Sequence, residues 1–76
     1  MMTAQQIKEL IEAGVEGAQA VVIGDDGQHF QARVIAAAFE GKSVVAQHRM
    51  VYEALGGRMG GEIHALALKT ETPAAT

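Results

Sequence analysis

The chain contains no cysteine, one proline and only three aromatic residues among its 76 positions. Without thiols it forms no disulfide, and it builds no zinc or iron–sulfur site from its own thiolates. A single domain of this length has little interior, and much of its apolar content is alanine. A deep enclosed pocket is therefore not expected, and neither is an enzyme.

Long apolar runs are also missing. No segment approaches the roughly 20 apolar residues that a membrane-spanning helix needs. The opening stretch MMTAQQIKEL has neither the basic region nor the apolar core of a signal peptide. We therefore expect a cytoplasmic protein without membrane contact. The formal net charge of −3 argues against nucleic acid as the main partner.

Capping and turn residues divide the chain into five predicted elements. Thr3 and Gln6 match a capping box that begins a helix. The Asp-Asp-Gly run at 25–27 is typical of a turn between two strands. Ser43 is suited to cap a second helix that ends near a glycine pair. The predicted elements are a helix at 4–13, strands at 18–24 and 30–37, a helix from 43 to about 56, and a strand at 62–69.

This α-β-β-α-β order predicts an α+β fold, with a three-stranded mixed sheet and both helices on one face. We expect a domain over 1–70 and a flexible tail over 71–76, which is polar and contains the proline. Spacing places four residues on the inner face of the second helix, namely Val44, His48, Val51 and Leu55.

The predicted sheet brings two histidines together. If the second and third strands pair directly, they are parallel and begin at the same edge. His29 precedes one of these strands and His64 opens the other. His64 shares its predicted strand face with Leu66 and Leu68 and follows four closely spaced glycines. It is therefore either a satisfied core group or a side chain held out to bind a ligand.

Two imidazoles make only half of a metal site, since zinc in a closed site takes four ligands. Asp25 and Asp26 offer oxygen ligands near His29, although their sequence is more typical of a turn. A hydrogen-bonded packing role is the simpler interpretation of His48. Ser43 is better used as a cap than as a nucleophile.

The segment FEGKSVVAQHRMVYEALGGRMGGEIHALALKT resembles the BolA family, and in particular its compact bacterial members. The similarity lies in the helix entry, the second helix and the closing IHAL strand, at Phe39, Gly41, Lys42, Ser43, His48, Arg49, Val51, Tyr52, Leu55, Ile63, His64, Ala65 and Leu66. This resemblance implies a class II KH-like fold.

The resemblance also implies a heterodimer with a monothiol, CGFS-type glutaredoxin that shares a 2Fe–2S cluster. The glutaredoxin and a bound glutathione each supply one thiolate. The BolA-like subunit supplies the closing-strand histidine, matched here by His64, and a loop ligand, matched by His29. Lys42, Arg49 and Arg58 are candidate contacts to glutathione or the partner. The isolated chain is then either a monomer or an apo homodimer.

The KH-like fold suggests an alternative, which is nucleic-acid binding in transcription regulation. A KH module clamps nucleotides with a GXXG loop. The matching turn here, Gly41 to Val44, lacks the second glycine. Four residues form the candidate nucleic-acid surface, namely Arg33, Lys42, Ser43 and Arg49. We rank this function second.

Overall fold

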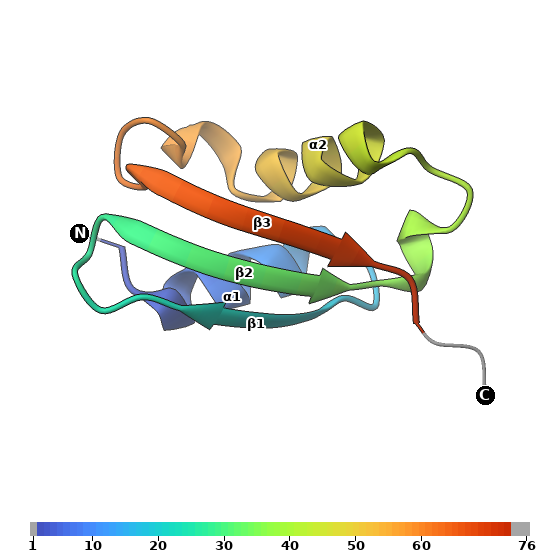
Figure 1. Cartoon of the computed structure of the whole chain (residues 1–76), viewed down its shortest axis with the longest axis horizontal. Coiled ribbons are helices and arrows are strands. Elements are labelled where there is room, and N and C mark those ends of the chain that lie inside the picture. The colour runs from blue at the N-terminus through green and yellow to red at the C-terminus, as the bar shows by residue number, and fades with distance from the viewer. Residues whose placement is uncertain (1, 74–76) are drawn as a thin grey trace.

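The computed structural model describes residues 2–73 and has the order α1-β1-β2-α2-β3 (Figure 1). The elements are α1 (Ala4–Gly14), β1 (Gln19–Ile23), β2 (His29–Ile35), α2 (Val44–Ala54) and β3 (Ala65–Glu71), with 3-10 turns η1 (Ala37–Phe39) and η2 (Gly56–Arg58) before and after α2. This confirms the predicted α+β class and element order. Across the described residues, no helix has the length and apolar character that crossing a bilayer requires.

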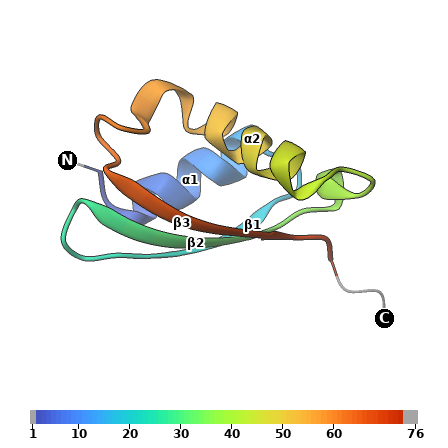
Figure 2. The ribbon, with the colours of Figure 1, turned by 45° about the horizontal axis from the view of Figure 1, so that its top comes forward.

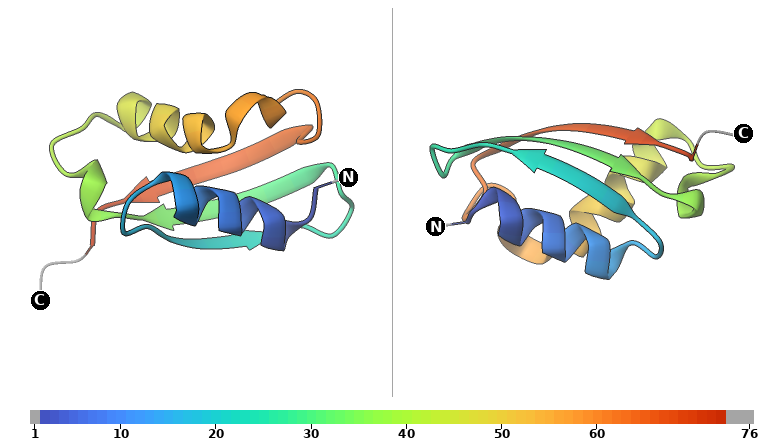
Figure 3. Two further views of the ribbon diagram at one scale, coloured as in Figure 1. Left: turned by 180° about the vertical axis from the view of Figure 1, so that it is seen from behind. Right: turned by 90° about the horizontal axis from the view of Figure 1, so that it is seen from below.

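The sheet is mixed, with the strand order β1-β2-β3. β1 and β2 are antiparallel, whereas β2 and β3 are parallel. Both helices cover one face of the sheet and leave the other face open (Figure 2, Figure 3). The parallel register pairs His29 with Ala65. The two parallel strands therefore start level with each other, as predicted.

The core lies between the sheet and the two helices. In β2, Phe30, Ala32 and Val34 are buried, while the alternating residues face solvent on the open side. Burial of apolar surface is the main driving force for folding. The largest fully buried side chains come from α1, β2, η1, α2 and the segments between elements: Phe39, Ile7, Ile11, Leu55, Ile63, Val15, Val34 and Val51.

Both predicted helix caps are present. At α1, the Thr3 Oγ1 accepts from the Gln6 backbone N–H at 3.1 Å, and the Gln6 Oε1 accepts from the Thr3 backbone N–H at 2.9 Å. At α2, the Ser43 Oγ accepts from the Ala46 backbone N–H at 3.2 Å. These bonds satisfy donors that the first turn of a helix leaves unpaired.

Several predicted boundaries were wrong. The second strand stops before Ala37, which begins η1. The third strand begins at Ala65 and continues to Glu71, so residue 71 belongs to the sheet and not to a tail. Glu71 also accepts from the Arg33 Nε and Nη2 at 2.6 and 3.0 Å, which ties it to β2. Of the predicted tail, residues 74–76 lie outside the described residues.

The inner face of α2 was only partly predicted. Val51 and Leu55 are fully buried, as expected, but Val44 is 62% exposed. A polar side chain occupies the inner position at this end of the helix instead. The Gln47 Oε1 accepts from the Thr70 hydroxyl of β3 at 2.7 Å. The residues of α2 that face the sheet therefore include Gln47 as well as Val51. Because Gln47 is polar, the hydrophobic pattern alone did not predict its position.

Candidate metal-ligating edge of the sheet

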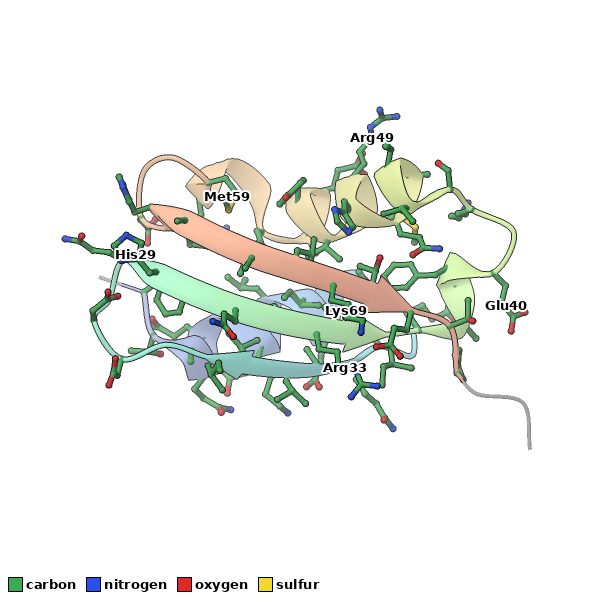
Figure 4. The ribbon with its side chains drawn as sticks, viewed as in Figure 1. His29, Arg33, Glu40, Arg49, Met59 and Lys69 are labelled. Carbon is green, nitrogen blue, oxygen red and sulfur yellow. The ribbon has the colours of Figure 1, made fainter. Side chains whose placement is uncertain are left out.

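The structure brings His29 and His64 together at one edge of the sheet. His29 is the first residue of β2, and His64 directly precedes β3. Their ring centroids are 5.5 Å apart, and the rings meet edge to face at 85°. Both side chains are exposed, and Figure 4 shows His29 at the end of its strand. The predicted convergence of the two imidazoles is confirmed.

His64 is not a buried core group. Leu66 and Leu68 are partly buried against the core, but the strand alternation does not extend back to His64. The preceding residue, Ile63, is fully buried, whereas alternation along the predicted strand would place it on the face opposite the leucines. Of the two interpretations left open by the sequence, the structure supports the histidine held out toward solvent.

A closed turn fixes the backbone just before His64. The Ile63 N–H donates to the Arg58 carbonyl at 2.9 Å, and the Gly60 N–H donates to the Ile63 carbonyl at 2.8 Å. Gly60 has a φ of +83°, which favours glycine. The buried Ile63 side chain anchors this turn to the core. The position of His64 is therefore set by packing and not by a free loop.

Asp26 holds the loop that precedes His29. Its Oδ1 accepts from the backbone N–H groups of Gln28 and His29, both at 2.8 Å. Its Oδ2 lies 2.8 Å from the Nδ1 of His29. The backbone N–H of His29, the His29 ring and the backbone N–H of Gln28 hold the pKa of Asp26 well below its ordinary value. The turn predicted for this segment is confirmed.

The sequence did not lead us to predict the contact between Asp26 and the His29 ring. We considered Asp26 as an oxygen ligand or a turn residue, and not as a partner of the imidazole. Its spacing contained a signal, because an Asp that accepts from the backbone two and three residues later brings its second oxygen toward the side chain at i+3.

A glycine at the other end of the same loop lies against β2. Gly24 has a φ of +152°, and a Cβ there would lie 2.6 Å from both the His29 carbonyl oxygen and the Phe30 Cδ1. Distances below 3.0 Å are not tolerated by a real Cβ. The loop thus approaches the start of β2 closely only because residue 24 has no side chain.

The donor set suits a metal shared with another molecule. Imidazole is a good ligand for iron, copper and zinc. Within residues 2–73, no group of three or more His, Cys, Asp or Glu side chains is placed to hold a metal ion. Among the described residues, the two exposed histidines therefore offer at most an incomplete coordination sphere for a metal ion.

The three predicted cationic contacts lie in different places. The backbone carbonyl of Arg58 accepts from the N–H of Ile63, the residue before His64, which places Arg58 at the histidine end of the molecule. Its Nη1 donates to the Leu55 carbonyl at 2.9 Å. Lys42 follows the far end of the seven-residue β2, which separates it from His29 by roughly 20 Å. Arg49 points away from the sheet (Figure 4). Of the three, only Arg58 lies at the histidine end.

The two arginines of the alternative nucleic-acid surface, Arg33 and Arg49, lie on different sides of the molecule. Arg33 lies on the open face of the sheet, where its ion pair with Glu71 raises the pKa of Arg33. Arg49 projects from α2, on the other side of the molecule (Figure 4). The Ser43 hydroxyl is used by the helix cap.

His48 is separate from the histidine pair. It is half-buried on α2, and its ring lies edge to face with Tyr52 at a centroid distance of 6.4 Å. The two side chains line a shallow surface depression together with Val45 and Arg49. Across the described residues the His48 ring makes no hydrogen bond, so its predicted hydrogen-bonded packing role is not supported.

The fold and the site define a class of protein: an α+β domain with a pair of histidines where its two parallel strands begin. A family model described as BolA-like protein matches residues 9–75. The chain is 46% identical to a bolA protein homologue from Coxiella burnetii, whose structure aligns with a TM-score of 0.84 over 96% of this chain and 94% of that one. The chain belongs to the BolA-like family.

Curated relatives are similar over most of this chain. It is 43% identical to BolA-like protein 1 from Mus musculus over 58 residues, which is 76% of this chain and 42% of the relative. It is 44% identical to SufE-like protein 1 from Arabidopsis thaliana over 52 residues, which is 67% of this chain and 14% of the relative. The chain thus spans less than half the length of these two relatives.

Proposed function

We propose that this BolA-like chain is the histidine-donating partner of a monothiol, CGFS-type glutaredoxin. In this proposal the heterodimer holds a 2Fe–2S cluster together with glutathione, for iron–sulfur trafficking or for sensing iron and redox state. The chain acts as a binding partner in the cytoplasm and not as an enzyme. The partnership and the cluster come from the family resemblance, and the site geometry supports them.

The observation that carries the proposal is the exposed pair of imidazoles, with ring centroids 5.5 Å apart. The chain has no cysteine, so the sulfur ligands of such a cluster must come from the glutaredoxin and from glutathione. Two nitrogen donors at an open edge suit that division. Arg58 remains a candidate contact to glutathione at the same end of the molecule, whereas Lys42 and Arg49 are candidates for other partner contacts.

The chemistry supplied by a bound cluster is electron transfer and the delivery of iron and sulfide. Neutral histidines in place of thiolates make such a centre less negatively charged, which raises its reduction potential, as in Rieske centres. Imidazole is also protonated and displaced more readily than thiolate ligands at mildly acid pH. His29 and His64 therefore suit a cluster that is passed on or that reports on conditions.

The test is reconstitution with a reduced monothiol glutaredoxin, glutathione, iron and sulfide. The wild-type chain should form a heterodimer with a visible absorption and circular dichroism spectrum that differs from that of the glutaredoxin alone. His64→Ala and His29→Ala should each change that spectrum. His48→Ala is the matched control, because it removes a histidine outside the pair and should leave the spectrum unchanged.

Each variant should be checked for folding by far-ultraviolet circular dichroism and urea unfolding. Both ligand histidines are exposed, so their removal should leave the unfolding midpoint close to that of the wild type. A wild-type chain that forms no coloured heterodimer would refute the proposal. If the heterodimers of all three histidine variants have the same spectrum as the wild-type heterodimer, the ligand assignment is refuted.

The alternative as a nucleic-acid-binding regulator has less support. Arg33 and Arg49 lie on different sides of the molecule, the Ser43 hydroxyl is used by the helix cap, and the net charge is −3. It predicts an affinity that depends on Lys42 and Arg49 and decreases steeply with salt. A salt titration of DNA binding by the wild-type chain and by Lys42→Ala would detect such binding.

A further inference from the structure

We infer that Asp26 is a positioning residue for His29. Its carboxylate keeps the proton on the Nδ1 of His29 and leaves the Nε2 as the nitrogen with the free lone pair. The inference rests on the proposed function for the role of His29 as a ligand. The assignment of the proton to the Nδ1 of His29 rests on the loop geometry alone.

The Asp26 carboxylate joins the loop backbone and the imidazole. One oxygen accepts from the N–H groups of Gln28 and His29, and the other lies 2.8 Å from the His29 Nδ1. An ionised carboxylate only accepts hydrogen bonds, so the nitrogen facing it must carry a proton. A neutral imidazole has one N–H, so the proton on Nδ1 leaves the Nε2 unprotonated.

The remaining nitrogen is open to a ligand. Among the hydrogen bonds of residues 2–73, the His29 Nε2 takes part in none. Metals bind the unprotonated nitrogen of a histidine. Metal-ligating histidines commonly donate their other N–H to a carboxylate, which fixes the ring and makes the ligand more basic. The contact between Asp26 and His29 has this arrangement before any metal is bound.

The arrangement is built into the loop and is not a chance surface contact. An isolated exposed ion pair contributes little, because water competes with it. Here the two backbone bonds hold the carboxylate in place, and the ring contact is only three residues away in sequence. Gly24 further restricts the conformation of the loop, because it lies directly against the backbone of His29.

The chain offers a matched control for the test. Asp25 is the neighbouring carboxylate, and across the described residues it makes no hydrogen bond to His29. Asp25→Asn and Asp26→Asn remove the same charge one position apart. The asparagine at 26 can still accept from the backbone, but its NH₂ group favours an unprotonated Nδ1. A difference between the two variants therefore reports on the ring contact and not on net charge.

The first measurement is a long-range ¹H–¹⁵N correlation spectrum of the imidazoles in the isolated chain, at about pH 8.5, where histidines are ordinarily neutral. His29 should show a protonated Nδ1 and an unprotonated Nε2 in the wild type and in Asp25→Asn. In Asp26→Asn the Nδ1 should shift toward the unprotonated position. A wild-type ring with its proton on the Nε2, or an Asp26→Asn ring that keeps it on the Nδ1, would overturn the inference. The wild-type spectrum decides the tautomer even if the variant does not fold.

The second measurement is the rate of cluster loss from the reconstituted heterodimer. Asp26→Asn should release the cluster about 10–100-fold faster than the wild type, whereas Asp25→Asn should not. Equal rates would show that the tautomer has no effect on the ligand and would overturn the positioning role. If the wild type forms no cluster complex, the proposed function fails, and the tautomer is still judged from the first measurement.

Discussion

Gly24→Ala should destabilise the fold and displace the loop that leads into His29. The φ of +152° is essentially restricted to glycine, and a non-glycine residue in such a region costs about 1–3 kcal/mol. The added Cβ would also lie 2.6 Å from the His29 carbonyl oxygen and must push it away. We expect a loss of about 1–3 kcal/mol from a total stability of roughly 4–11 kcal/mol for a domain of this size.

The assay is urea unfolding, with Gly57→Ala as the control. Gly57 has a φ of −88° and open space around its Cβ position, so alanine there should change stability by between zero and a gain of about 1 kcal/mol. A proton NOE between the rings of His29 and His64 should also weaken in Gly24→Ala and persist in Gly57→Ala. If the two variants have equal unfolding midpoints and the same NOE, the reasoning about loop packing is wrong.

Three further substitutions test the structure. Ile63→Val should cost about 0.5–1.5 kcal/mol in urea unfolding, because Ile63 is fully buried, and no loss would contradict its anchoring role. Ser43→Ala should cost about 1 kcal/mol by the same assay, because the Ala46 N–H loses its cap; an unchanged midpoint would show that the cap is dispensable. The hydrogen bonds and charge of Arg33 lower the pKa of Glu71 in the folded state. The stabilisation of the folded state by this ion pair is therefore fully present above the ordinary carboxyl pKa and is lost as the pH falls through the lowered pKa. The difference in thermal midpoint between wild type and Glu71→Gln should therefore be present at neutral pH and disappear in acid, and a constant difference would contradict the linkage.

The sequence predicted most of the topology and the main feature of the site. Thr3, Gln6 and Ser43 are capping residues with local effects, so both helix starts were readable from the chain. Because β2 and β3 are parallel neighbours, the position of each histidine at a strand start was enough to place the two together. That inference needed only strand order and direction.

The errors came from tertiary contacts that a linear pattern does not contain. Gln47 was not among the residues predicted on the inner face of the second helix, but its side chain accepts a hydrogen bond from Thr70 of β3. The strand start moved from residue 62 to Ala65 because the turn before it closes on Ile63. The other end extends to Glu71, where Arg33 of the neighbouring strand pairs with it. The Gln47–Thr70 and Arg33–Glu71 contacts join residues distant in sequence, and the turn before β3 is held by the burial of Ile63 in the core.

His29 and His64 are 35 positions apart in the sequence, so their rings lie close together only when the chain is folded. In an unfolded chain, bringing the two rings together would cost about 3 kcal/mol of loop-closure entropy. A partner that required both nitrogens would therefore bind folded copies of the chain in preference to unfolded ones. By mass action, its binding would in turn protect those copies from unfolding.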